Sequence, residues 1–310
     1  MAHRIRLGTT DLQVSPVCYG SWQLSPRFWG DQPRDTLVTA IRRAFDVGVN
    51  FYDTADAYGD GYAETVLGEA LATLPRDEIV IATKAYNHFF PDGRRFGDLS
   101  ADYLPQACEA SLRRMKIDVI DLYQCHMFDQ LTPVAETAGA LDDLVRKGWI
   151  RAYGVSNWSA DQMRLGRSVG AFASCQPKYS LLHRESERDV LPCCQEHDMG
   201  VLVYSPLALG LLTGKFNGDE QFDDLRANHA LYQGERFRDL CDRVRQAGEI
   251  AAKYDLTTVQ LVLTVTLMHP AIHCAIVGIK NPSQIEEAAG AMGKTISRED
   301  WYAARQLLKP

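Results

Sequence analysis

Four polar side chains end or follow short apolar runs in the first half of the chain, and together they could move a proton. Asp53, Lys84 and His126 each end such a run, and Tyr58 lies five residues after Asp53. A free phenol titrates near pH 10, so it exchanges protons slowly at neutral pH. A neighbouring ammonium favours the phenolate and is expected to lower the pKa of Tyr58. A shift of about two units needs roughly 2.7 kcal/mol, which one close, poorly solvated charge can supply.

These residue types suit proton transfer to a carbonyl oxygen, or from an alcohol, coupled to hydride movement. In this interpretation Tyr58 is the general acid/base, Asp53 keeps Lys84 charged and oriented, and His126 donates a hydrogen bond to the substrate oxygen. Each residue alone has a simpler explanation: a structural salt bridge, a buried histidine or a loop aromatic. Their occurrence at successive strand ends favours the catalytic interpretation.

The rest of the sequence predicts the elements that must position these side chains. Short apolar runs alternate with amphipathic stretches of helical period, always in the same order. The runs interpreted as strands are 17–21, 49–53, 79–84, 119–126, 150–156, 172–176, 201–204 and 275–277. The helical stretches are 34–48, 62–74, 99–115, 133–148, 160–169, 187–197, 237–254 and 282–291.

Eight strand–helix units indicate parallel strands joined by right-handed crossovers, and the count of eight favours a closed (β/α)8 TIM barrel. An open, doubly wound sheet is disfavoured because no Gly-x-Gly-x-x-Gly motif lies at an early strand-to-helix turn. We expect a single α/β domain over residues 1–310, with an N-terminal β-hairpin. Extended loops, above all 206–235, are expected at the C-terminal face, where the chemistry of such barrels lies.

Composition excludes several other classes of protein. The 310 residues carry 33 Lys and Arg against 40 Asp and Glu, a net charge of −7, so nucleic acid is not an expected partner. No secretory signal is visible, and glutamine, histidine and proline interrupt the apolar stretch 256–279, so no membrane span is expected. Eight scattered cysteines then indicate free thiols in the cytoplasm. No metal site is predicted, because Cys193-Cys194 and Cys125-His126 lack Cys-x-x-Cys spacing. The oligomeric state stays open.

Several motifs, in the same order along nearly the whole chain, resemble those of the aldo-keto reductase superfamily. They are Gly48-Val-Asn-Phe-Tyr-Asp53-Thr-Ala-Asp-Ala-Tyr58-Gly, Ile81-Ala-Thr-Lys84, Asp121-Leu-Tyr-Gln-Cys-His126, Gly154-Val-Ser156-Asn157, Gln176 and Val203-Tyr204-Ser-Pro-Leu207. Members of that family are (β/α)8 barrels that reduce aldehydes and ketones with NADPH. The resemblance implies that Tyr58 is the general acid/base and that Lys84 lowers its pKa. It also implies that Asp53 is the partner of Lys84 and that His126 orients the carbonyl.

The resemblance also implies a cofactor site. Ser156, Asn157 and Gln176 would hold the nicotinamide carboxamide, and Tyr204 would stack on the ring. Lys280 is placed to meet a 2′-phosphate, but it stands where many relatives have arginine, and lysine lacks the bidentate contact. Ala288 stands where many relatives have asparagine. We therefore expect NADP(H), with NAD(H) as a second cofactor. The remaining candidates for cofactor binding are Ser205, Leu207, Gly278, Gln284 and Glu287.

Aromatic side chains in the loops after the strands predict an apolar pocket for a small carbonyl or alcohol: an aldehyde, a ketone or a sugar. The candidates are Trp22, Tyr86, Phe128 and Trp158. One other function remains open at this point. It is a non-catalytic regulatory subunit of the same fold, channel-associated or redox-sensing, which binds the cofactor and reports its state. A metal-dependent barrel hydrolase is disfavoured, because it would need clustered histidine and aspartate at the strand ends, and the sequence shows none there.

Overall fold

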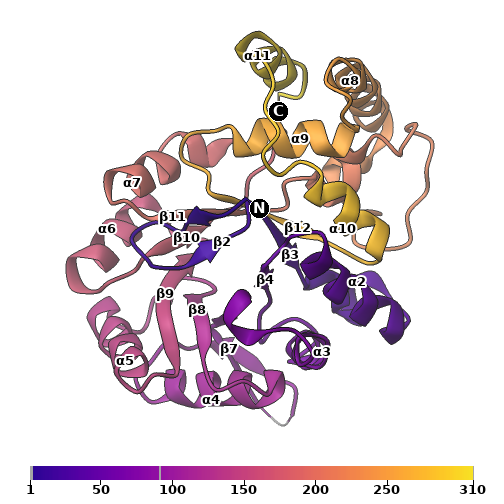
Figure 1. Ribbon diagram of the computed structural model, residues 1–310. Helices are drawn as coiled ribbons and strands as arrows, with labels where there is room; N and C mark the ends of the chain where they lie inside the picture. Colours follow the sequence, from indigo (N-terminus) through magenta and orange to yellow (C-terminus); the bar gives the residue numbers. More distant parts are fainter. Residues whose placement is uncertain (1–2, 91, 310) are drawn as a thin grey trace.

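Eight parallel strands form a closed barrel in the computed structural model, which describes residues 3–90 and 92–309 (Figure 1). Each strand pairs with the next along the chain, and the last pairs with the first. The predicted (β/α)8 barrel is confirmed. The barrel strands are β3 (Val17–Gly20), β4 (Phe51–Asp53), β5 (Val80–Ala85), β8 (Ile120–Cys125), β9 (Ile150–Ser156), β10 (Ser174–Gln176), β11 (Gly200–Tyr204) and β12 (Cys274–Gly278).

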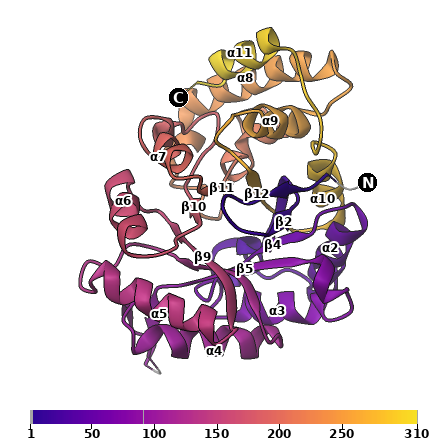
Figure 2. The same ribbon diagram turned by 60° about the vertical axis from the view of Figure 1, so that its left-hand side comes forward.

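Helices surround the barrel as an outer layer (Figure 2). The helices between and after the strands are α2 (Arg34–Asp46), α3 (Tyr62–Leu71), α4 (Tyr103–Met115), α5 (Val134–Arg146), α6 (Ala160–Val169), α7 (Val190–Glu196), α9 (Thr258–Leu267) and α10 (Pro282–Ala289). Two more helices, α8 (Gly234–Ala252) and α11 (Arg298–Leu307), contact α9 and each other. The apolar stretch 256–279 thus contains α9 and β12. None of the described helices is long and apolar enough to cross a bilayer.

An N-terminal hairpin closes the end of the barrel at which the strands begin. It consists of β1 (Ile5–Arg6) and β2 (Gln13–Val14), paired antiparallel. Leu7 and Leu12 of the hairpin belong to the same buried cluster as Phe51 and Leu122 of the barrel strands. This cluster fills the barrel, so the barrel is a packed core and not a pore.

Some elements at the opposite end, where the strands finish, were not expected from periodicity. They include α1 (Pro26–Trp29) after β3 and a second hairpin after β5, formed by β6 (Asn87–Phe89) and β7 (Arg95–Gly97). These segments are too short for a periodic pattern to show. The long connection after β11 is confirmed and contains two 3₁₀ turns. The 3₁₀ turns of the described residues are η1 (Trp22–Leu24), η2 (Arg76–Glu78), η3 (Glu185–Glu187), η4 (Ala208–Thr213) and η5 (Ala230–Tyr232).

Candidate active site

A cavity opens at the end of the barrel where the parallel strands finish. Side chains that end different parallel strands meet at this face. The cavity brings together many of the residues that the sequence assigned to catalysis and cofactor binding. Those on its wall are Trp22, Asp53, Tyr58, Gln176, Tyr204, Ser205, Leu207, Gly278, Lys280, Gln284 and Glu287.

Asp53 and Lys84 form an ion pair at the floor of the cavity. Asp53 ends β4, and Lys84 lies near the end of the adjacent strand β5. Lys84 Nζ donates to Asp53 Oδ1 at 2.6 Å and to the carbonyl oxygen of Thr54 at 2.8 Å. The side chain of Asp53 is 3% exposed and that of Lys84 is 0% exposed. Burial lowers the pKa of Lys84, but Asp53 and Tyr58 raise this pKa by more, so the ammonium stays charged.

Two glutamine amides hold the second oxygen of Asp53. Gln176 Nε2 donates to Asp53 Oδ2 at 2.8 Å, and Gln124 Nε2 donates to the same oxygen at 3.4 Å. These contacts give a hydrogen-bond partner to the oxygen of Asp53 that does not pair with Lys84, and so they fix the orientation of the buried carboxylate. Sequence reasoning missed Gln124, although a signal was present. Gln124 pairs with Lys84 across β5 and β8 and lies two residues before His126, so strand alternation places it on the face of these side chains.

Tyr58 lies in the loop after β4, and its ring is close to the ammonium of Lys84. Lys84 Nζ is 5.2 Å from the centre of the ring. Burial raises the pKa of Tyr58, Lys84 lowers it and Asp53 raises it, with a net increase. The expectation that this pKa falls below that of a free phenol is therefore wrong for the protein without ligand. The cause is that Asp53 offsets the ammonium charge while burial removes the ring from water. Tyr58 thus carries its proton at neutral pH.

His126 directly follows β8 and meets the Tyr58 ring edge-on, with ring centres 5.9 Å apart and planes at 83°. Burial and the charge of Lys84 lower the pKa of His126 to about 3. The imidazole is therefore neutral at physiological pH, with one ring nitrogen as donor and the other as acceptor. A neutral imidazole in this place is suited to a hydrogen bond with a substrate oxygen, and not to supplying a proton.

Ser156, Asn157 and Tyr204 are joined by hydrogen bonds beside the cavity. Asn157 Nδ2 donates to the carbonyl oxygen of His126 at 3.0 Å, and the Tyr204 hydroxyl donates to Asn157 Oδ1 at 2.9 Å. Ser156 Oγ donates to the carbonyl oxygen of Gln176 at 2.9 Å. Asn157 has a left-handed backbone with φ of 60°, which asparagine tolerates better than most residues. The ends of β8, β9, β10 and β11 are thereby tied to one another.

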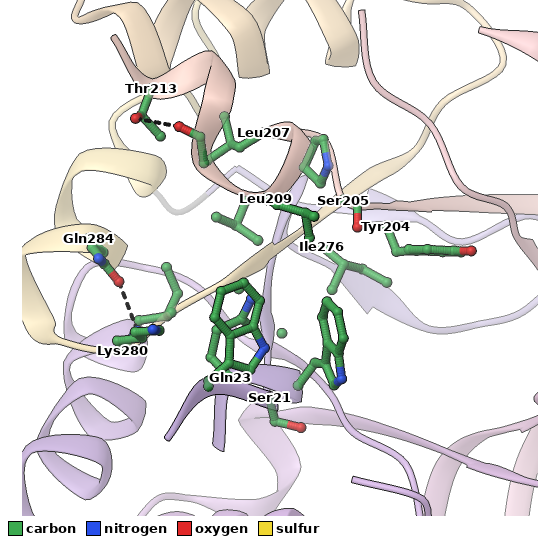
Figure 3. A pocket seen from close by; sticks show the side chains of 18 of the residues that line it. Ser21, Gln23, Tyr204, Ser205, Leu207, Leu209, Thr213, Ile276, Lys280 and Gln284 are labelled. Carbon is green, nitrogen blue, oxygen red and sulfur yellow. Dashed lines mark hydrogen bonds between the residues drawn. The ribbon is translucent and has the colours of Figure 1, made fainter. Parts of the chain in front are cut away.

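Cationic side chains gather at the other end of the cavity. Figure 3 shows Lys280 and Gln284 on one side of the view and Tyr204 on the other. Lys280 follows β12, whereas Lys215 and Arg226 come from the long loop after β11. Arg226 pairs with Asp224 at 2.6 Å, and neither lysine forms a salt bridge with a described residue. Burial and the charge of Arg226 lower the pKa of both lysines. Sequence reasoning named the loop, but not Lys215 or Arg226.

The backbone near these cations is shaped for close contact with a ligand. Ser205, Ala208 and Leu209 have φ values of 59°, 47° and 57°, which are uncommon for residues other than glycine. Such strained backbone tends to gather at binding sites. As expected, Pro282 begins α10, and Gln284 Oε1 accepts a hydrogen bond from the backbone N–H of Lys280 at 2.8 Å.

The predicted substrate residues lie in different surroundings. Trp22 is on the cavity wall, whereas Tyr86, Phe128 and Trp158 are not among the lining residues. Trp158 is 3% exposed, and its ring centre is 5.0 Å from that of Phe128. A Cβ on Gly97 would overlap the ring of Tyr86, so Tyr86 packs on the β6–β7 hairpin. These three side chains support the loops around the cavity.

The donor set of the cavity fits a nicotinamide dinucleotide. Amide and hydroxyl groups surround Tyr204 at one end, and at the other lie the ammonium groups of Lys215 and Lys280, which form no salt bridge within the described part of the chain. A dinucleotide brings a carboxamide and phosphates, which match these groups in kind. Among residues 3–90 and 92–309, no group of three or more His, Cys, Asp or Glu side chains could hold a metal ion.

Comparisons with known proteins show which chains this one is similar to. Aldo-keto reductase YhdN of Bacillus subtilis is 34% identical over 307 residues, which cover 98% of this chain and 92% of that protein. NADH-specific methylglyoxal reductase of Escherichia coli is 33% identical over 319 residues, covering 98% of each chain.

Solved structures give the same result. The glycerol dehydrogenase AKR11B4 from Gluconobacter oxydans has a TM-score of 0.92 and 33% identity, covering 99% of this chain and 95% of that one. The holo form of aldo-keto reductase AKR11C1 from Bacillus halodurans has a TM-score of 0.82 and 28% identity, covering 99% and 96%. The sequence model of the aldo/keto reductase family matches residues 16–309 of this chain. The chain is therefore a member of the aldo/keto reductase family, an oxidoreductase family that uses NAD(P)H.

Proposed function

We propose that this protein interconverts a small carbonyl compound and its alcohol, with Tyr58 as the general acid/base. The observation that carries the proposal is the position of a protonated phenol against the buried Lys84–Asp53 pair, on the wall of the cavity that also holds the expected cofactor residues. Carbonyl reduction needs a proton at the oxygen as the carbon accepts hydride. A phenol that keeps its proton at neutral pH can supply it.

The residues of the chain have distinct roles in this reaction. A bound nicotinamide would supply or accept the hydride. Tyr58 donates its proton to the substrate oxygen, and Lys84 stabilises the phenolate that is left, because its ammonium lies 5.2 Å from the ring centre. Asp53 holds Lys84 in place, and neutral His126 donates a hydrogen bond to the same oxygen. In alcohol oxidation the phenolate of Tyr58 accepts the proton.

For the cofactor, we propose NADP(H) with NAD(H) also accepted. Lys280 is available for a 2′-phosphate because it forms no salt bridge with a described residue. A single ammonium is a weaker anchor for phosphate than a bidentate guanidinium, so the preference is moderate. The relative from Escherichia coli is named as NADH-specific, which is the reason to include NAD(H) in the proposal.

The substrate we propose is a small carbonyl or alcohol that reaches Tyr58 beside Trp22. Trp22 contacts Phe28 and Trp29, with ring centres 5.6 Å and 5.3 Å away, so this side of the cavity is apolar. The relatives are named for glycerol and methylglyoxal, both of three carbons. The eight cysteines are free and buried, which supports a reducing compartment such as the cytoplasm.

Tyr58→Phe tests the proposal. It removes the proton donor and keeps the ring, so kcat for carbonyl reduction should fall by about 10²- to 10⁴-fold, while the Kd for NADPH stays within about twofold. Steady-state NADPH oxidation over a panel of aldehydes and ketones measures kcat, and calorimetry measures Kd. Normal turnover of Tyr58→Phe would assign the proton to another group. Tight NADPH binding by the wild type with no turnover on any substrate would favour the regulatory subunit.

A further inference from the structure

We propose that the indole N–H of Trp29 donates a hydrogen bond to a phosphate oxygen of the bound dinucleotide. This inference rests on the proposed function, because it requires a nicotinamide dinucleotide in the cavity. Trp29 is the last residue of α1, in the loop after β3, and it lines the same cavity as Tyr58 and Lys280.

The first support is a donor without a partner. Trp29 is 8% exposed, and its Nε1 is buried without a hydrogen-bond partner among the described residues. A buried tryptophan N–H usually has an acceptor, because leaving the donor unpaired costs free energy. Since Trp29 is on a cavity wall, its acceptor can arrive with a ligand.

The second support is the charge around the ring. Lys280 Nζ is 4.5 Å from the centre of the Trp29 ring, and Arg226 Cζ is 6.0 Å from it. Lys280 and Lys215, which lines the same cavity, form no salt bridge with a described residue. A cation over an aromatic face keeps its N–H groups free for other acceptors. The unpaired donor therefore lies among positive charges, and its natural acceptor is an anion. Phosphate is the anion that a dinucleotide supplies.

The third support is that the indole is already held in place. The ring meets that of Trp22 edge-on, with centres 5.3 Å apart and planes at 82°. Gln32 Nε2 donates to the carbonyl oxygen of Trp29 at 3.3 Å. A donor that is fixed before the ligand arrives loses little conformational entropy on binding. Nε1 itself is buried, so a neighbouring side chain must move aside before a phosphate oxygen reaches it, while the indole ring stays in place.

Calorimetric titration with NADPH and with NADH tests the inference in three proteins: wild type, Trp29→Phe and Trp149→Phe. Phenylalanine keeps an aromatic face for Lys280 and removes the N–H. Trp149 is the matched control, because Lys147 Nζ lies 5.2 Å from its ring centre but Trp149 precedes β9, away from the cavity. Losing a hydrogen bond to a charged group should raise the Kd of Trp29→Phe by about tenfold or more. Trp149→Phe should bind like the wild type.

The pattern of losses identifies the phosphate. An increase in Kd for both cofactors supports a bond to the pyrophosphate, and an increase for NADPH alone supports a bond to the 2′-phosphate. If Trp29→Phe binds both cofactors as tightly as the wild type, or if Trp149→Phe loses as much affinity, the inference is overturned. If the wild type binds neither cofactor, the proposed function fails and this inference fails with it.

A second substitution separates loss of the N–H from loss of ring size or folding. Replacing Trp29 by 3-benzothienylalanine keeps a bicyclic ring of nearly the same shape and puts sulfur in the place of the N–H. We expect this protein to show the same rise in Kd as Trp29→Phe, with an unchanged melting temperature. A Kd equal to that of the wild type would overturn the inference even if Trp29→Phe fails to fold.

Discussion

The two ends of the cavity differ in how completely their charges are paired. At the catalytic end, Lys84 and Asp53 are buried, paired at 2.6 Å and carried by strands. At the other end, Lys215 is exposed and Lys280 is half-buried; both are on loops, and neither forms a salt bridge with a described residue. Paired charges on strands hold their geometry without a ligand, whereas unpaired cations on loops need an anion to complete them. The proposed catalytic groups are therefore assembled in advance, whereas the proposed phosphate site would be completed by the anion that binds there.

The largest expected effect of this difference is on the stability of the protein. Lys84→Met leaves Asp53 buried without its cation, so the free energy of unfolding should fall by about 3–5 kcal/mol. Lys280→Met should change it by less than about 0.5 kcal/mol, because it removes a partly exposed charge that forms no salt bridge with a described residue. Urea denaturation measures both. The double variant Asp53→Asn/Lys84→Met is the control and should recover part of the loss. Equal effects of Lys84→Met and Lys280→Met would contradict the contrast.

The preference for NADPH over NADH should depend on Lys280, at the end of the cavity that the loops form. Lys280→Ala removes the ammonium expected at a 2′-phosphate, which is worth about 1.5–3 kcal/mol as a charged hydrogen bond. The ratio of kcat/KM with NADPH to kcat/KM with NADH should fall by roughly tenfold or more. The control is Lys215→Ala, which should weaken the binding of NADPH and of NADH alike. Lys84 cannot serve as this control, because it is too deeply buried to meet the phosphates. An unchanged ratio in Lys280→Ala would remove Lys280 from cofactor selection.

The pH dependence of carbonyl reduction and of alcohol oxidation tests the protonation states of Tyr58 and His126. Because the pKa of Tyr58 is raised, the phenol stays protonated across neutral pH, so carbonyl reduction should be flat from about pH 6 to 9 and fall only above about pH 10. Alcohol oxidation needs the phenolate and should rise with pH, by up to about tenfold per unit. His126, with a pKa of about 3, should add no step near pH 6.5. A step near pH 6.5 that disappears in His126→Asn would contradict the neutral imidazole.

The smallest expected effect concerns the two amides on Asp53. Gln124→Met removes a donor at 3.4 Å and should cost about 1 kcal/mol of unfolding free energy or less. Gln176→Met removes a donor at 2.8 Å from the same oxygen, and Gln176 also lines the cavity. It should cost more stability and also weaken NADPH binding. Calorimetry and urea denaturation on both variants separate these effects. If Gln124→Met alters NADPH affinity as much as Gln176→Met, Gln124 has a role beyond supporting Asp53.

Strand ends could be predicted from the sequence because polar residues after apolar runs are visible locally. Asp53, Lys84 and His126 were found in this way, and the barrel follows from the count of strands. Lys215, Arg226 and Trp29 lie in loops that the sequence identified, but they could not be assigned to this cavity, because the path of a loop depends on packing between distant segments. The direction of the pKa shift of Tyr58 was also out of reach. That direction is a balance between burial and two opposite charges, and burial is a property of the folded chain.

The N-terminal hairpin limits how small molecules can enter and leave the barrel. Leu7 and Leu12 cap the cylinder at the far end, and Phe51 and Leu122 fill the space between that cap and the floor of the cavity. No route through the axis is left for a small molecule in the described part of the chain. In the proposed function, reactant and product would therefore enter and leave on the side of the cavity where Trp22 lies, and a bound dinucleotide would share that opening with them. The release of one molecule would then be delayed by the presence of the other, which would make release, and not hydride transfer, the slow step.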